Sequence, residues 1–262
     1  MLVIGERING MYKDVGKAIK ERDKKVIQDL AKKQVASGAS MLDVNVGPAA
    51  KDAQEAMKWL VETIQEVVDA GLCLDSTKPA VIEEGLKVVK NKAMVNSSTA
   101  DKEKLDIFVP MAKQYKARLI GLTLGKSGVP RDRAQRSEYA AAILTSCVEA
   151  GFNLEELYID PIVLPVNVAQ PQSLEALEAL REFRFLYNPP PKTVVGLSNV
   201  SQGTENRSLI NRTFLIMAQA QGLDAAIVDP MDKELMDAMI TAELLLNKNI
   251  YCDSYLDAYK KK

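Results

Sequence analysis

Short runs of apolar and β-branched residues recur along the chain at intervals of about 20 to 40 residues. Runs of this length and composition are typical of strands that are buried on both faces. The runs that predict strands are Leu2–Ile4, Met41–Val46, Leu72–Asp75, Ala93–Asn96, Arg118–Thr123, Leu157–Asp160, Thr193–Leu197 and Ala225–Asp229.

The segments between these runs have the hydrophobic period and the composition of helices. The predicted helices lie around residues 24–37, 52–69, 79–90, 101–116, 133–150, 173–186, 207–221 and 232–246. Eight strands alternating with helices predict the α/β class and a single (β/α)8 TIM barrel, with residues 1–262 as one domain. An open, doubly wound sheet is the structural alternative. It is disfavoured because no Gly-x-Gly-x-x-Gly fingerprint follows the first strand.

Polar side chains stand where the predicted strands end. In a TIM barrel these ends meet at one face, and that face carries the active site. The candidates are Glu6, Asn9, Asp43, Asn45, Asp75, Ser76, Thr77, Asn96, Ser97, Ser98, Asp160, Ser198, Asn199 and Asp229. One Asp or Asn after a strand is more often a cap or a turn former than a ligand. So many at one face indicate a binding site.

The second predicted strand indicates which way these groups point. Asp43 and Asn45 alternate with apolar neighbours, so their side chains are expected to face the barrel interior. Carboxylates and amides without clustered basic residues suit a neutral heterocycle that offers adjacent N–H donors, as a pterin does. Phosphate substrates are disfavoured because the loops after strands seven and eight lack the glycine-rich pattern of the usual barrel phosphate site.

The sequence contains no histidine, which excludes imidazole acid–base chemistry, zinc–histidine sites and Ser–His–Asp triads. Proton transfer therefore falls to carboxylates, Lys, Tyr, Cys or water. The three cysteines are far apart, so neither a disulfide framework nor a metal site is predicted. With 34 Lys and Arg against 35 Asp and Glu, the chain has no net field to attract nucleic acid or an anionic membrane.

The N-terminal sequence MLVIGERING carries charge where a signal peptide keeps its apolar run. No apolar segment approaches the roughly 18 residues of a membrane span. A cytoplasmic protein is expected.

Six motifs together carry a family signature. They are GERING, LDVNVGP, CLDST, VNSS, IDP and GLSNVSQGTENRSLINRTFL, the last of which begins in the run from Thr193 to Arg207. The set resembles the pterin-binding barrel family of folate-dependent methyltransferases and dihydropteroate synthases. Over essentially the whole chain the resemblance is to the methyltetrahydrofolate:corrinoid/iron–sulfur protein methyltransferases. The longest motif decides this, since the folate domain of cobalamin-dependent methionine synthases shares it and dihydropteroate synthases do not.

The resemblance implies a role for individual residues. Asp75, Asn96 and Asp160 would bind the pterin ring, and Asn199 would lie at N5, the atom that bears the methyl group. The implied folate-binding set is Asp75, Asn96, Asp160, Gly196, Ser198, Asn199, Gln202 and Arg207, with Arg207 towards the aminobenzoate end. Asn199 and Asp160 are the predicted catalytic residues. Asn199 can donate a hydrogen bond but cannot supply a proton, so we expect a network of Asn199, Asp160 and ordered water to protonate N5.

The resemblance also implies the reaction and the partners. A methyl group would move from 5-methyltetrahydrofolate to the Co(I) corrinoid of a corrinoid/iron–sulfur protein, in the reductive acetyl-CoA pathway. The folate is then the methyl-donor substrate, the corrinoid belongs to the partner and none is resident, and the chain forms a homodimer. The alternatives are a methyltransferase that uses another corrinoid or a thiol acceptor, a dihydropteroate-synthase-like condensation, and a folate-binding protein without catalysis.

Overall fold

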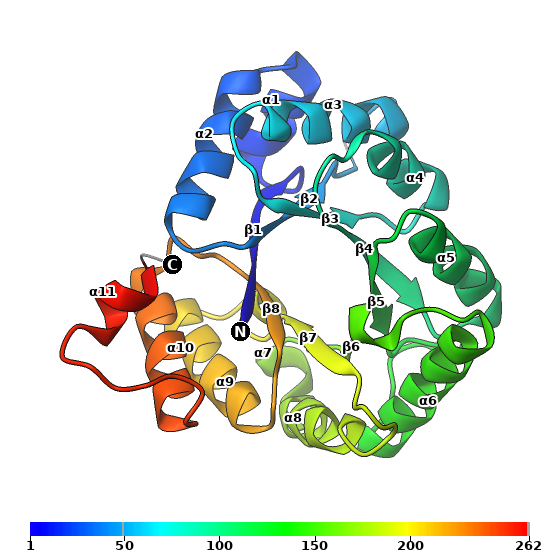
Figure 1. The fold of residues 1–262 in the computed structure, drawn as a ribbon, viewed down its shortest axis with the longest axis vertical. Coiled ribbons are helices and arrows are strands. Elements are labelled where there is room, and N and C mark those ends of the chain that lie inside the picture. The colour runs from blue at the N-terminus through cyan, green and yellow to red at the C-terminus, as the bar shows by residue number, and fades with distance from the viewer. Residues whose placement is uncertain (49, 261–262) are drawn as a thin grey trace.

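The computed structural model describes residues 1–48 and 50–260, in which eight parallel strands close into a barrel in chain order (Figure 1). The strands are β1 Leu2–Asn9, β2 Met41–Asn45, β3 Gly71–Asp75, β4 Ala93–Thr99, β5 Arg118–Leu122, β6 Leu157–Asp160, β7 Lys192–Gly196 and β8 Ala225–Val228. Pairing of β1 with β8, from Leu2 opposite Ala225 to Gly5 opposite Val228, closes the ring. The predicted TIM barrel is confirmed, and closure excludes the open doubly wound sheet.

The helices form the outer ring around the strands (Figure 1). They are α1 Lys13–Glu21, α2 Lys24–Ala36, α3 Ala53–Gln65, α4 Pro79–Val88, α5 Lys102–Gln114, α6 Arg133–Glu149, α7 Val166–Ala169, α8 Pro171–Phe183, α9 Arg207–Ala220, α10 Lys233–Leu245 and α11 Tyr255–Lys260, with 3-10 turns η1 Leu154–Glu156 and η2 Leu197–Asn199. Every predicted helix is present, while α1, α7 and α11 were not predicted. Within residues 1–48 and 50–260, no helix is both long and apolar enough to cross a membrane.

Two strands run further than the sequence predicted, and both carry an irregular register. Strand β1 was expected to end at Ile4 but reaches Asn9, and its pairing with β2 shifts between Gly5 and Ile8. Strand β4 continues to Thr99, and its pairing with β5 shifts between Asn96 and Ser98. Irregularities of this kind re-aim side chains and are common beside active sites. Both shifts lie at the carboxyl-terminal half of their strands.

One apolar side chain from each strand fills the inside of the barrel. These residues are Ile4, Met41, Cys73, Met94, Ile120, Tyr158, Val194 and Ala225, each no more than 4% exposed. A larger cluster packs between the outside of the strands and the helices. The barrel is therefore closed by packed side chains below its mouth, as expected for eight strands.

Removal of a side chain from this inner layer should cost stability. Met94 is 0% exposed, so Met94→Ala leaves a cavity and is expected to lower the free energy of unfolding by about 2–5 kcal/mol. The measurement is urea denaturation followed by circular dichroism. Met11→Ala is the matched control because Met11 is 71% exposed. Equal destabilisation by the two substitutions would contradict a packed interior.

Candidate active site at the barrel mouth

A layer of acids and amides lies directly above the apolar interior. Successive side chains of a strand point to opposite faces, so the second residue after each interior position faces the interior again. On five strands that residue is polar: Glu6 follows Ile4, Asp43 follows Met41, Asp75 follows Cys73, Asn96 follows Met94 and Asp160 follows Tyr158. On β8 it is Ile227, and Asp229 comes two residues later, just past the end of the strand. Strand geometry thus converts the sequence pattern into a polar ring at the mouth.

On strands β2 to β4, two hydrogen bonds tie this ring together. Asn45 stands opposite Asp75 in the register and donates its Nδ2 to Asp75 Oδ2 over 2.6 Å. Asn96 stands on the other side of Asp75 and donates its Nδ2 to Asp43 Oδ1 over 3.0 Å. Each acid is therefore paired with an amide of another strand. The thiol of Cys73, in the apolar layer below the ring, is hydrogen-bonded to Asp43.

Asp160 ends β6 and is only 8% exposed. Its Oδ1 accepts the N–H of Ile162 over 2.8 Å, and the N–H of Gly196 on β7 also bonds to its carboxylate. Burial nevertheless dominates and raises the pKa of Asp160 to about 7, although these two N–H groups and the positive charge of Arg136 oppose the rise. An acid with this pKa can hold or release a proton near neutral pH.

The turn after β7 brings Asn199 towards Asp160. Gly196 ends the strand, and η2 follows with Ser198 and Asn199. A Cβ atom on Gly196 would lie 3.2 Å from Asn199 Nδ2, so the amide folds back over the glycine. Because the N–H of the same glycine holds Asp160, the Asn199 amide and the Asp160 carboxylate border one residue. Asn199 itself is exposed at the rim.

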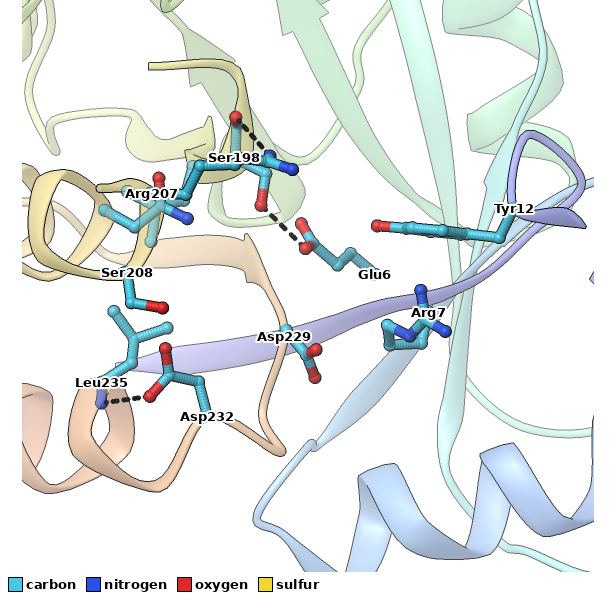
Figure 2. A pocket seen from close by; sticks show the side chains of 11 residues that line it. Glu6, Arg7, Tyr12, Ser198, Arg207, Ser208, Asp229, Asp232 and Leu235 are labelled. Carbon is cyan, nitrogen blue, oxygen red and sulfur yellow. Dashed lines mark hydrogen bonds between the residues drawn. The ribbon is translucent and has the colours of Figure 1, made fainter. Parts of the chain in front are cut away.

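A pocket of about 240 Å³ opens beside this turn, between β1, β8 and α9 (Figure 2). Ser198 Oγ donates to Glu6 Oε1 over 2.7 Å at its centre. Arg207 closes the turn, with Nε donating to Ser201 Oγ over 3.2 Å and Nη2 to the Ser198 carbonyl over 3.3 Å. Ligand pockets commonly measure about 300–1,000 Å³, so this pocket fits part of a folate rather than the whole molecule.

The pocket also shows what the β1 irregularity does. Glu6 and Arg7 are consecutive residues in the irregular part of β1, and regular alternation would point them to opposite faces. Both nevertheless line the pocket. The Arg7 guanidinium lies over the ring of Tyr12, with Cζ 3.9 Å from the ring centre, and Nη2 lies 3.6 Å from Asp14. Stacking on an aromatic face fixes the orientation of the cation. The pocket therefore has mixed charge, because Arg7 and Arg207 line it together with the acids Glu6, Asp229 and Asp232.

Burial next to other acids perturbs the remaining carboxylates of the ring. The pKa of Asp43 lies well above its usual value because of burial first and the charge of Asp75 second. Burial also raises the pKa of Asp75, while the Asn45 amide lowers it. Glu6 follows the same rule: burial raises its pKa most, the Ser198 hydrogen bond lowers it, and the charge of Asp229 raises it. The ring attracts hydrogen-bond donors strongly because its acids are poorly solvated.

The eight residues of the predicted folate set fall into three groups. Asp75 and Asn96 stand on adjacent strands, bonded to Asn45 and Asp43 respectively. Asp160 and Gly196 are bonded to each other across β6 and β7. The third group is the turn after β7, with Ser198, Asn199, Gln202 and Arg207, of which the last three are exposed. The first group lies on β3 and β4 and the second on β6 and β7, so strand β5 separates them around the barrel.

Several residues of the mouth were not assigned to the folate set. Glu6, Asp43, Asn45 and Asp229 had been singled out as strand ends but given no role. Arg7, Tyr12, Ser208, Asn211 and Asp232 were missed, although each lines the pocket. The GERING motif contained a signal for Arg7, but only the irregular pairing of β1 with β2 turns it to the same side as Glu6. Within the described residues, no group of three or more Cys, Asp or Glu side chains is arranged to hold a metal ion.

The fold and this polar mouth define a class of protein. Residues 10–229 match the family described as pterin binding enzyme, and the chain belongs to that family. It is 28% identical over 263 residues to the methylcorrinoid:tetrahydrofolate methyltransferase of Eubacterium limosum, an alignment that covers 100% of this chain and 97% of that protein. It is also 29% identical over 241 residues to the methionine synthase of Mycobacterium tuberculosis, covering 87% of this chain but only 20% of that much longer protein.

Solved structures share the fold at lower identity. A dihydropteroate synthase of Coxiella burnetii, in complex with pteroic acid, superposes with a TM-score of 0.73 at 17% identity over 95% of this chain and 94% of that one. The Yersinia pestis enzyme with a pterine–sulfa conjugate gives a TM-score of 0.70 at 17% identity, over the same shares of the two chains. These likenesses establish the barrel architecture.

The raised pKa of Asp160 predicts a pH-dependent stability difference. Between about pH 4 and pH 7 the unfolded chain loses the Asp160 proton while the folded chain keeps it, so unfolding becomes easier as the pH rises. Asp160→Asn removes this effect. The free energy of unfolding of the variant minus that of the wild type should therefore increase with pH over this window, by about 1.4 kcal/mol per unit at most.

Urea titrations at pH 4.5, 5.5, 6.5 and 7.5 measure the difference. Asp106→Asn is the control, because Asp106 lies exposed on α5 in an ion pair with Lys102. A pH-independent difference between Asp160→Asn and the wild type would show that Asp160 titrates normally.

Proposed function

We propose that this protein transfers a methyl group between N5 of 5-methyltetrahydrofolate and the cobalt of a corrinoid. In its finer form, the proposal makes the acceptor the Co(I) corrinoid of a corrinoid/iron–sulfur protein in the reductive acetyl-CoA pathway. The observation that carries the proposal is the ring of buried and half-buried acids with half-buried amides, and with an exposed amide, Asn199, at its rim. The Eubacterium limosum relative is named for the exchange in the opposite direction. One site can catalyse both directions because they share a transition state.

The polar ring supports pterin binding. A pterin has an amino group next to a ring N–H, and a carboxylate can accept both hydrogen bonds in parallel. Asp75 is a half-buried carboxylate on β3 and Asp160 a buried one on β6, and Asn96 on β4 adds an amide that can both donate and accept. These three residues would hold the ring, and Gly196 with Ser198 would border its edge. Arg207 would lie towards the aminobenzoate end.

The proposed reaction requires the site to supply a proton to N5. In the forward direction the bond from the methyl carbon to N5 breaks, the methyl carbon bonds to cobalt, and N5 takes up a proton. The nitrogen is a poor leaving group unless a donor stabilises the electron pair that returns to it. Asn199 would donate a hydrogen bond to N5, and Asp160, whose pKa is about 7, would supply the proton through ordered water. No histidine is required.

The rim supports a protein acceptor. Asn199, Gln202 and Arg207 are all exposed, and so are the residues between Gln202 and Arg207 except half-buried Thr204. A corrinoid held by another protein could reach N5 from this side without entering the barrel. The folate is thus a substrate of this chain, and the corrinoid is a cofactor of its partner.

A homodimer is also part of the proposal. Helix α10, although apolar in sequence, buries Met239 and Ile240 in the barrel's own packing and leaves mainly Leu245 outside. A groove between α8 and α9 offers more apolar surface, including Leu174 and Met217, which are more than 45% exposed. Light scattering of the purified chain measures its mass in solution.

Substitution of Asp75 should weaken folate binding. Asp75→Asn replaces an acceptor of two N–H groups by an amide that can accept only one, so the dissociation constant for tetrahydrofolate should rise roughly 10- to 100-fold. Isothermal titration calorimetry measures it. Asp69→Asn, at the opposite end of β3, is the control and should bind as the wild type does. Unchanged binding by Asp75→Asn would remove Asp75 from the site.

Substitution of Asn199 should instead slow methyl transfer. Loss of a donor used in the transition state typically lowers the rate by about 10²–10³, and Asn199→Ala should do so while folate binding changes little. Asn91→Ala, before β4 at the far end of the barrel, is the control. The role of Asn199 is disproved if the variant binds folate and transfers the methyl group at the wild-type rate.

The function itself is tested by absorption spectroscopy. Protein is mixed anaerobically with methyltetrahydrofolate and Co(I) cobalamin, then with methylcobalamin and tetrahydrofolate, and the cobalt spectrum is followed. Exchange in either direction supports the proposal. Transfer only to a thiol identifies another acceptor, and tight folate binding with no transfer to any acceptor identifies a passive binding protein. A purified corrinoid/iron–sulfur protein reacting faster than free cobalamin supports the finer form.

A further inference from the structure

Arg136 is a charged side chain buried behind the site. It lies on α6, outside the barrel wall, and is 0% exposed. Arginine is rarely buried without partners, because removal of its charge from water is costly. Its Nε donates to the Pro161 carbonyl over 2.7 Å, and its Nη2 donates to the Ile162 carbonyl over 3.4 Å and to Gln172 Oε1 over 2.8 Å. Two of its three acceptors therefore belong to the residues that directly follow Asp160.

The turn that Arg136 binds is the one that orients Asp160. Ile162 has φ of +64°, a left-handed conformation that a β-branched residue adopts only when its surroundings impose it. In that conformation its N–H points back to Asp160 Oδ1 over 2.8 Å. The carbonyls of the turn thus face the guanidinium while its N–H faces the carboxylate.

The backbone of Asp160 is also held in place. Thr123, just after β5, donates both its N–H and its Oγ1 to the Asp160 carbonyl, over 3.0 and 2.9 Å. Thr123 thus holds the backbone of Asp160, and the Ile162 N–H holds its side chain. The carboxylate can still shift if the Pro161–Ile162 turn moves. Arg136 restrains this movement from the side of α6.

We propose that Arg136 is a positioning residue for Asp160, which acts by clamping the Pro161–Ile162 turn whose N–H holds the carboxylate. The inference rests on the proposed function in one respect only, the role of Asp160 as a proton donor. Arg136 also supplies the positive charge that acts on Asp160, and Asp132 of the α6 N-terminus and Glu175 of α8 act on Arg136 in turn. From β5 and β7 the carboxyl group and its backbone meet only the uncharged groups of Thr123 and Gly196 among the described residues.

The test compares Arg136→Met with Arg133→Met. Arg133 lies one turn earlier on the same helix, exposed, in ion pairs with Glu178 and Glu182, so its substitution removes the same charge at the surface. The pKa of Asp160 is measured by carbon-13 NMR of the aspartate carboxyl groups in ligand-free protein, with Asp160→Asn to assign the signal. Loss of an adjacent cation and of a held N–H should raise the pKa of Asp160 by about one unit or more in Arg136→Met. Arg133→Met should leave it unchanged.

Two milder substitutions keep the test decisive if Arg136→Met does not fold. Arg136→Lys keeps the charge but can reach fewer carbonyls, so the pKa should rise by less than in Arg136→Met. Gln172→Leu removes one acceptor of the guanidinium and leaves both turn carbonyls in place, so it should produce a smaller rise. An unchanged Asp160 titration in every folded variant at Arg136 and Gln172 overturns the proposal, whatever the loss of stability.

Activity separates this inference from the proposed function. If the wild type transfers methyl groups, the pH profile of its kcat/KM should move to higher pH in the Arg136 variants, in parallel with the NMR titration. If the wild type transfers none, the proposed function fails, while the NMR titration of the ligand-free protein still decides whether Arg136 positions Asp160.

Discussion

The apolar layer inside the barrel excludes water from the interior, and the pKa values of the acids at the mouth depend on this exclusion. Side chains such as Met94 and Tyr158 fill the interior completely, so the acids one layer above them are solvated from one side at most. Poor solvation raises the pKa values of Asp43, Asp75 and Asp160 together. A wet interior would return these acids to ordinary surface behaviour. The same packing that stabilises the barrel therefore gives its mouth an affinity for N–H donors.

Much of this arrangement follows from the sequence, because alternation along a strand is a local property. The eight apolar runs each became a strand, and polar residues at their ends, such as Asp75 and Asp160, reached one mouth by the geometry of the barrel alone. The helix predicted around residues 232–246 also forms, as α10, with Asp232 accepting the N–H of Leu235 at its start. Features that depend only on neighbouring residues in the chain could therefore be predicted.

Features that depend on contacts between distant segments could not be predicted from the sequence. The shift in register that places Glu6 and Arg7 in one pocket is set by how β1 meets β2. Helix α1 was missed because it is short and contains Gly16. Arg136 looks like any solvent-facing residue of an amphipathic helix, and only the three-dimensional structure reveals that the turn after β6 lies over it. The roles implied for the folate set all remain predictions. Gln202 and Arg207 are exposed, and the hydrogen bonds of the Arg207 side chain stay within its own loop.

The division between buried strands and an exposed loop gives the barrel a modular character. The acids that would hold a pterin, Asp75 and Asp160, are the last residues of strands β3 and β6. The segment 202–206 is bonded to α7, where Asn167 Nδ2 donates to the Gly203 carbonyl over 3.2 Å, and the Ser198–Glu6 and Arg207–Ser201 hydrogen bonds hold the chain on either side of it. If the methyl acceptor docks at this rim, as proposed, substitutions in segment 202–206 would change which acceptor is used and would leave the strand residues of the folate site in place.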